Sequence, residues 1–373
     1  MGRERPSSSV TPAMLSSEEP MPSHRRLKDE ALVRPLIAAL REPAFLVDAG
    51  GRVVAANAAA QTATPALRLG EHLSRGLRAP EVLDALARVL AGGDAENAAW
   101  AERAPVECWF EATVAPLRLE GFEPGAVVSL RDLTEARRVE RMRADFVANA
   151  SHELRTPLAS LLGFVETLQG PARDDGAARE KFLGVMREQA QRMARLIDDL
   201  LSLSRIEQHL HLRPADPVDL SALTLHIAET LTHLARDNGV RLDLDAAPGV
   251  VAPGDRDELA RVVENLIENA IKYGRRDSDP APRVEVTLRQ TGSTAELTVR
   301  DFGPGVAPEH IPRLTERFYR VDANKSRAKG GTGLGLAIVK HIVLRHRGRL
   351  AIESDIGEGS TFRVLLPLGA QGR

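Results

Sequence analysis

The chain has 373 residues, with a hydrophobic fraction of 43% and a charged fraction of 27%. This length and composition allow roughly two or three globular domains. With 50 basic and 52 acidic residues, the chain lacks the strong basic excess of a general nucleic-acid-binding protein, so direct nucleic-acid binding is not expected. The single cysteine, Cys108, excludes an intramolecular disulfide and fits a reducing cytoplasm, where we expect it to be a packed residue.

The start of the chain shows no targeting or membrane signal. Residues 1–26 are rich in Ser, Pro, Glu and Arg and predict a disordered tail without a signal-peptide core. No stretch reaches the length of about 20 apolar residues that a membrane-spanning helix needs, and the candidate Ala31–Leu40 is interrupted by Arg34. We therefore expect a cytoplasmic protein that reaches a membrane only through a partner.

Residues 27–133 predict a small α+β domain that opens with a helix over Leu27–Leu40. Alternating apolar residues predict strands, and turn formers at residues 48–51 join the first two. Helical patterns separate the second strand from the third. The predicted strands cover Ala44–Val47, Arg52–Ala56, Val106–Leu117 and Gly125–Arg131.

Residues 134–209 predict a helical hairpin, with one helix over Thr134–Gln169, a break at residues 170–176 and a second helix over Ala178–Glu207. Each helix carries an apolar stripe, and the first has the 4-3-4-3-4 spacing typical of a helical bundle. One hairpin has little apolar surface of its own, whereas two copies form a four-helix bundle. We therefore expect a homodimer. The stripes comprise Ala150, Leu154, Pro157, Leu161, Phe164 and Leu168, and Phe182, Met186, Met193, Leu196, Leu200 and Leu203.

His152 falls on the first helix at the position furthest from the apolar seam. An exposed imidazole can receive a phosphoryl group, and its neutral, nucleophilic form is well populated near neutral pH. We expect Glu153 to bond one ring nitrogen and leave the other free to attack. Thr156 places a hydroxyl about one turn later.

Residues 218–373 alternate helical and strand-like runs, which predicts a separate α/β domain. The predicted helices cover Leu220–Asn238, Asp257–Tyr273 and Leu334–Arg345. The predicted strands cover Val240–Leu244, Arg283–Leu288, Ala295–Arg300, Leu350–Glu353 and Thr361–Leu366.

The second of these helices carries four polar residues on neighbouring positions. Asn265, Asn269 and Tyr273 recur every fourth residue and share a face, and Lys272 lies on the same side. An amide oxygen can ligate Mg²⁺, and lysine can neutralise phosphate. We predict a nucleotide site here with Asn269 as the Mg²⁺ ligand.

The segment 301–305 reads Asp-Phe-Gly-Pro-Gly directly after a predicted strand. The Asp301 carboxylate can accept a hydrogen bond from an adenine amino group. Gly303 and Gly305 permit close backbone approach and unusual dihedral angles. The same residue types also form an ordinary turn, so this segment alone leaves both interpretations open.

A second glycine-rich segment opens the predicted helix at Leu334. Gly331, Gly333, Leu334 and Gly335 place backbone donors at a helix N-terminus, which favours phosphate binding. The polar tract 306–329 between the two glycine segments has the length of a lid that orders over a nucleotide.

The string Ser151–Leu158, S-H-E-L-R-T-P-L, resembles the phosphoacceptor box of sensor histidine kinases in two-component systems. The segments around Asn265, Asp301, Phe318 and Gly333 resemble the asparagine, first glycine, phenylalanine and second glycine boxes of that family, in the expected order. This resemblance covers residues 137–368.

The resemblance implies a multidomain fold. It predicts an α+β PAS-like sensor, a helical hairpin that dimerises into a four-helix bundle, and an α/β-sandwich ATP-binding domain of the GHKL (Bergerat-like) type shared with gyrase and clamp chaperones. The PAS similarity lies in Phe45–Asp48, Val53–Asn57 and Leu130–Glu135, and the alternative is an unrelated α+β spacer.

The resemblance also implies the activity. With ATP and Mg²⁺, the protein would phosphorylate its own His152, transfer that group to an aspartate of a response regulator receiver domain, and use Thr156 to dephosphorylate the regulator. Arg317–Leu366 is particularly similar to phosphate-regulon sensor kinases, which implies phosphate signalling, although many of those carry membrane helices. Gyrase-type ATPases have Glu in place of Asn265. A mainly phosphatase role and an inactive scaffold remain as alternatives, and the signal at the PAS-like domain stays unknown.

Overall fold

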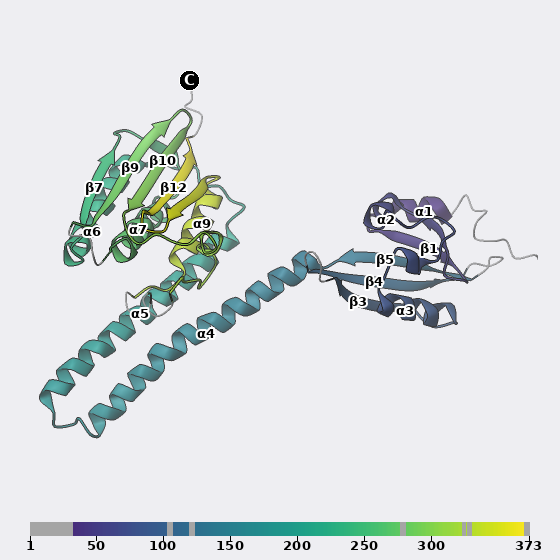
Figure 1. Ribbon diagram of the computed structural model, residues 1–373, viewed down its shortest axis with the longest axis horizontal. Coiled ribbons are helices and arrows are strands. Elements are labelled where there is room, and N and C mark those ends of the chain that lie inside the picture. The colour runs from purple at the N-terminus through teal and green to yellow at the C-terminus, as the bar shows by residue number, and fades with distance from the viewer. Residues whose placement is uncertain are drawn as a thin grey trace, which may run out of the picture. The chain divides into compact units, whose positions relative to one another are not determined.

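The computed structural model describes residues 33–102, 107–118, 124–276, 281–322, 326 and 330–368. The chain forms two compact units, Met1–Ala144 and Asp145–Arg373 (Figure 1). The predicted tail over residues 1–26 and the start of the predicted helix Leu27–Leu40 lie outside the described residues.

The first unit is an α+β domain built on one antiparallel sheet of order β2-β1-β5-β4-β3. Successive residues of β1 face opposite sides of this sheet, so Phe45 packs with α3 and Leu46 packs with Ile37 of α1. Both sheet faces are therefore covered. The elements are α1 (Val33–Ala39), β1 (Ala44–Asp48), β2 (Val53–Ala56), α2 (Ala58–Ala63), η2 (Leu73–Arg75), α3 (Pro80–Leu90), β3 (Glu96–Glu102), β4 (Cys108–Leu117) and β5 (Gly125–Asp132).

The four predicted strands of this unit are confirmed to within a few residues, but β3 was not predicted. Its sequence, Glu-Asn-Ala-Ala-Trp-Ala-Glu, is poor in the β-branched residues that favour strands. Pairing with β4 stabilises the strand instead. Trp100 of β3 stacks on Phe110 of β4, with ring centroids 5.2 Å apart.

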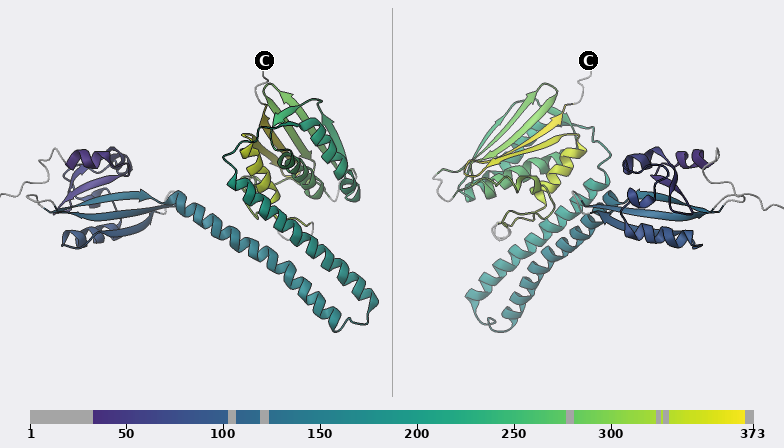
Figure 2. Two further views of the ribbon diagram at one scale, coloured as in Figure 1. Left: turned by 180° about the vertical axis from the view of Figure 1, so that it is seen from behind. Right: turned by 45° about the vertical axis from the view of Figure 1, so that its right-hand side comes forward.

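Helices α4 (Thr134–Gln169) and α5 (Gly176–Gln208) form the predicted antiparallel hairpin, visible in both views of Figure 2. The Asp175 side chain caps α5 by accepting from the backbone N–H of Ala177 and of Ala178. Near the turn, the rings of Phe164 and Phe182 stack with centroids 5.2 Å apart, which joins the two apolar stripes.

The ATP-binding domain predicted over residues 218–373 is a two-layer α/β sandwich. Its sheet has the order β11-β12-β10-β9-β7, and only the β7–β9 pair is parallel among the described strands. Helices α6, α7 and α9 cover one face of this sheet (Figure 1). The elements are α6 (Leu220–Asp237), β7 (Arg241–Ala246), α7 (Arg256–Tyr273), β9 (Arg283–Thr291), β10 (Thr294–Asp301), η3 (Ile311–Arg313), α9 (Gly335–Arg345), β11 (Arg349–Asp355) and β12 (Gly359–Pro367).

Alternation along the strands builds the core of this domain. In β9, Val284, Val286 and Leu288 are buried while the residues between them face away from the core. The short pair β6 (Pro217–Asp219) and β8 (Val251–Pro253) was not predicted, because three residues give too little pattern to detect.

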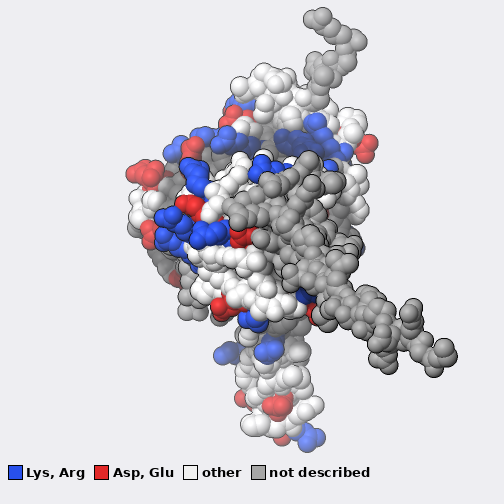
Figure 3. Space-filling view, turned by 90° about the vertical axis from the view of Figure 1, so that its right-hand side faces the viewer, with Lys and Arg blue, Asp and Glu red and all other residues white. Residues whose placement is uncertain are grey.

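The surface carries both signs of charge on the face shown in Figure 3, in keeping with the near-balanced composition. Among the residues that the structure describes, no helix combines the length and the apolar character needed to cross a membrane.

Candidate active site

Helix α7 carries both predicted asparagines and places Asn265 beside the glycine-rich loop. Its buried residues, which include Leu266 and Ile267, pack on the sheet, so Asn265 and Asn269 lie half-buried on another face. A Cβ atom built at Gly335 would lie 2.4 Å from Oδ1 of Asn265. Position 335 therefore lies against the Asn265 amide, and a larger residue there would displace that side chain.

Lys272 and Tyr273 end the same helix. The Lys272 ammonium pairs with the Glu268 carboxylate one turn earlier. The Tyr273 hydroxyl lies 3.0 Å from Oγ of Ser326, and a Cβ at Gly331 would lie 2.4 Å from that hydroxyl oxygen. Tyr273 therefore contacts the glycine-rich loop directly.

Asp301 is buried at the end of β10, with 6% of its surface exposed. Its Oδ1 accepts from the backbone N–H of Gly303 at 3.0 Å and of Ser360 at 3.2 Å. Burial raises the pKa of Asp301, against the opposing effect of these two donors and of Arg276. Gly305 has φ +71°, and a Cβ there would collide with the backbone oxygen of Asp355, so the second glycine is required.

The glycine-rich loop leads into α9, which begins at Gly335, one residue later than predicted. Leu334 is the N-cap residue and is fully buried, which anchors the start of the helix in the core. Gly333 has φ +75°, and its carbonyl accepts from the backbone N–H of Phe318 at 2.8 Å. Backbone donors at such a helix start are suited to phosphate.

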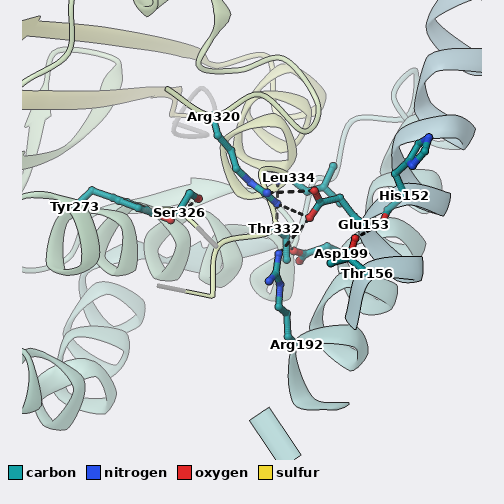
Figure 4. Close-up of polar contacts among 10 residues, drawn as sticks. All are labelled: His152, Glu153, Thr156, Arg192, Asp199, Tyr273, Arg320, Ser326, Thr332 and Leu334. Carbon is teal, nitrogen blue, oxygen red and sulfur yellow. Dashed lines mark hydrogen bonds and ion pairs between the residues drawn. The ribbon is translucent and has the colours of Figure 1, made fainter. Parts of the chain in front are cut away.

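His152 is exposed on α4, as predicted. The Thr156 hydroxyl, also exposed, donates to the His152 carbonyl at 3.3 Å. The predicted hydrogen bond between Glu153 and the His152 ring is wrong for this structure. Figure 4 shows the His152 ring pointing away from the Glu153 carboxylate, which accepts from Arg320 at 3.0 Å and from Arg192 at 3.2 Å. Arginine attracts the carboxylate more strongly than a neutral ring does.

Further contacts hold the ATP-binding domain against the base of the hairpin. The rings of Phe146 and Phe318 lie 5.9 Å apart, and Glu207 of α5 pairs with Arg317. Asp199 of α5 accepts from Arg261 and from Thr332 of the glycine-rich loop.

The sequence did not predict these linking residues, because each contact joins residues that are far apart in the chain and becomes visible only in the folded structure. One signal was available. Asp199 and Glu207 interrupt the apolar stripe that runs through Leu196, Leu203 and Ile206 on α5, and a carboxylate within a buried stripe indicates a specific partner.

Protein-family models match the three regions. They are the PAS fold over residues 37–138, the His Kinase A (phospho-acceptor) domain over residues 142–209, and the histidine kinase-, DNA gyrase B- and HSP90-like ATPase over residues 254–370. A sensor domain, a phosphoacceptor hairpin and an ATPase domain in this order define a sensor histidine kinase, and the chain belongs to that family.

Two curated relatives agree with this class. The phosphate regulon sensor protein PhoR of Pseudomonas aeruginosa is 44% identical over 233 residues, which cover 62% of this chain and 52% of that protein. The sensor protein kinase WalK of Staphylococcus aureus is 38% identical over 249 residues, or 66% of this chain and 59% of that protein. The chain thus spans about half the length of these curated relatives. Among solved structures, the histidine kinase AdeS of Acinetobacter baumannii matches with 25% identity and a TM-score of 0.47, covering 58% of this chain and 98% of that one.

Proposed function

We propose that this protein is an ATP-dependent protein-histidine kinase that phosphorylates its own His152. One observation carries the proposal: a single compact unit combines an exposed histidine in a phosphoacceptor sequence with a GHKL-type site made by α7, Asp301 and the glycine-rich loop.

The residues present fit ATP with Mg²⁺. Asp301 offers a buried carboxylate for the adenine amino group, and Asn269 offers an amide oxygen for the metal. Gly331 and Gly335 leave room that a Cβ would fill. Lys272 supplies positive charge on the same helix. Bound ATP supplies the phosphoryl group and bound Mg²⁺ neutralises phosphate charge.

His152 acts as the nucleophile. A bond forms between one ring nitrogen and phosphorus while the bond from phosphorus to the ADP oxygen breaks, and the ring gives its proton to solvent. In Figure 4 the ring points away from Thr332, so transfer requires a rearrangement of the ATP-binding domain or the histidine of a second copy.

The proposed partners are a second copy and a response regulator. Large apolar side chains on both hairpin helices are roughly half exposed, as expected of a surface that pairs with a second hairpin. The phosphoryl group then passes from His152 to an aspartate of the regulator, and the Thr156 hydroxyl orients water for later dephosphorylation. Because these steps use ATP and a receiver domain, we place them in the cytoplasm, and similarity to PhoR favours phosphate signalling. The exposed apolar residues are Leu158, Leu162, Leu183, Ile197 and Leu201.

Incubation with γ-labelled ATP tests the proposal. We expect acid-labile, base-stable label on the wild-type chain and none on His152→Gln, which should bind ATP as tightly as wild type because His152 lies outside the nucleotide site. His209→Gln, an exposed histidine after α5, should label normally. Acid-labile label on His152→Gln would contradict the assignment.

A further inference from the structure

Asp199 lies on the hairpin helix α5, yet both oxygens of its carboxylate bind the ATP-binding domain (Figure 4 shows its approach to Thr332). Oδ1 accepts from Nη2 of Arg261 at 2.7 Å, and Oδ2 accepts from the Thr332 hydroxyl at 2.8 Å. The Asp199 side chain is 18% exposed. Arg261 precedes Asn265 by one turn on α7, and Thr332 belongs to the glycine-rich loop. The carboxylate therefore connects the hairpin to two sides of the proposed nucleotide site.

The Thr332 hydroxyl already has two partners in this arrangement. It donates to Asp199 and accepts from the backbone N–H of Leu334 at 3.3 Å. Both the hydroxyl and that N–H are donors of the kind that a phosphate would use at the start of α9. While Asp199 holds Thr332, the hydroxyl proton is directed at the Asp199 carboxylate and is not available to a phosphate oxygen.

The charges around the loop give Asp199 a defined effect. Arg195 lies one turn before Asp199, and its Nη2 would be 3.2 Å from a Cβ at Gly330. The Arg320 side chain is 6% exposed and pairs with Glu153. Its Nε would lie 3.1 Å from a Cβ at Gly333. Asp199 thus adds negative charge beside a loop that Arg195 and Arg320 approach, and it neutralises Arg261. Its carboxylate opposes the phosphates both by repulsion and by engaging a cation.

We propose that Asp199 is a positioning residue that lowers the affinity for ATP while the hairpin and the glycine-rich loop are in contact. The loop must release Asp199 before the Thr332 hydroxyl can donate to a phosphate. This inference rests on the proposed kinase function and adds a regulatory residue to its nucleotide site. Because coupling is reciprocal, bound ATP must weaken the contact between the loop and the hairpin to the same degree.

The test compares full-length wild type with Asp199→Asn for binding of AMP, ADP and ATP in the presence of Mg²⁺ by calorimetry. We expect roughly threefold to tenfold tighter ATP binding in the variant, a smaller gain for ADP and the smallest gain for AMP, because repulsion by the carboxylate grows with the number of charged phosphates. The KM for ATP in autophosphorylation should fall by a similar factor with kcat little changed.

Three matched variants separate this role from a general loosening of the structure. Asp198→Asn removes the neighbouring exposed carboxylate and should leave all three affinities unchanged. Glu207→Gln weakens the hairpin contact with Arg317, which is not a loop residue, and its effect should not depend on the number of phosphates. In a Thr332→Val background, Asp199→Asn should tighten ATP binding less than it does in wild type, because the contact between the two side chains is already absent.

Unchanged or weaker ATP binding by Asp199→Asn overturns the inference, since weaker binding would mean that Asp199 prepares Arg261 for the nucleotide. Equal tightening for AMP and ATP overturns it as well. If Asp199→Asn does not fold, Asp199→Ser removes the same charge and carries the same expectations. Failure of the wild-type chain to bind ATP would instead contradict the kinase function, so the two failures are distinct.

Discussion

The pKa of the Asp301 carboxyl group is subject to opposing effects. Burial raises its pKa, and the N–H groups of Gly303 and Ser360 together with the Arg276 guanidinium act in the other direction without cancelling that rise. Asp301 therefore takes up a proton at a pH above the range of an ordinary aspartate. An ionised carboxylate accepts more strongly from an adenine amino group than a protonated one does, so the proposed role of Asp301 predicts that nucleotide binding is sensitive to pH.

We predict that ATP affinity falls as the pH decreases through this raised pKa. Asp301→Asn should bind ATP about tenfold or more weakly and should lose this pH dependence, because an amide does not titrate. Calorimetric titrations across a pH series measure both effects. Asp355→Asn, which alters an exposed carboxylate on β11, serves as the control. A wild-type profile identical to that of Asp301→Asn would contradict the role of Asp301.

Thr156 allows a second prediction at the same scale. Its exposed hydroxyl lies one turn after His152, where a docked regulator would place its aspartyl phosphate. Thr156→Ala should keep autophosphorylation and lose most dephosphorylation of a purified phosphorylated regulator. Ser151→Ala is the matched control, because Ser151 is an exposed hydroxyl on α4 that likewise donates to the carbonyl four residues earlier. Equal dephosphorylation by Thr156→Ala and wild type would remove Thr156 from the mechanism.

At the scale of helices and strands, local pattern determined what the sequence could predict. Helix α4 was predicted with its observed ends because its apolar residues repeat with a helical period over 36 residues. Strand β3 was not predicted, because its residues have little intrinsic strand preference and form a strand only by pairing with β4. The positions of Asp301 at the end of a strand and of Leu334 at the start of a helix followed from the neighbouring strand and helix patterns. The Glu153 contacts were not, since Arg320 lies 167 residues away in the chain.

The packing of α7 against α9 depends on His346. This buried side chain at the C-terminus of α9 accepts through Nε2 from the backbone N–H of Asp255, the N-cap of α7, at 3.0 Å. Its Nδ1 lies 2.8 Å from the Ile342 carbonyl, so the neutral ring carries its proton on Nδ1. Burial lowers the pKa of His346, because a charged ring loses solvation in this site.

We predict that the ATP-binding domain loses stability as the pH falls below about 6.5, the ordinary pKa of histidine, because the unfolded chain then binds more protons than the folded one. His346→Ala should lower the free energy of unfolding by about 1–3 kcal/mol above that pH. Its stability should also change less on acidification. Burial raises the pKa of nearby Glu258, which gives the opposite slope, so the prediction is made for the difference between wild type and variant. Denaturant unfolding measures these values, with exposed His226→Ala as control. Equal slopes would contradict the prediction.

At the scale of the whole molecule, the hairpin has two apolar surfaces, one buried against its own chain and one exposed. The C-terminal part of α5 contributes Leu196, Leu203 and Ile206 to the core of the ATP-binding domain. Leu162 of α4 and Leu201 of α5 are instead roughly half exposed. A hairpin that buries one stripe against its own chain and exposes another has a surface left for a second copy.

The last prediction tests that surface in the full-length chain. Leu162→Glu combined with Leu201→Glu should convert a dimer, with twice the chain mass of 40.5 kDa, into a folded monomer, because charged side chains cannot be buried at a paired seam without partners. Light scattering gives the mass, and circular dichroism checks that the helices persist. Leu225→Glu changes an equally exposed leucine on α6 and should leave the dimer intact, because α6 lies outside the hairpin. The monomer should still bind ATP, since none of the proposed nucleotide-binding residues lies at either position. A wild-type chain that is monomeric, or a double variant that stays dimeric, would show that the exposed hairpin stripe is not the dimer interface.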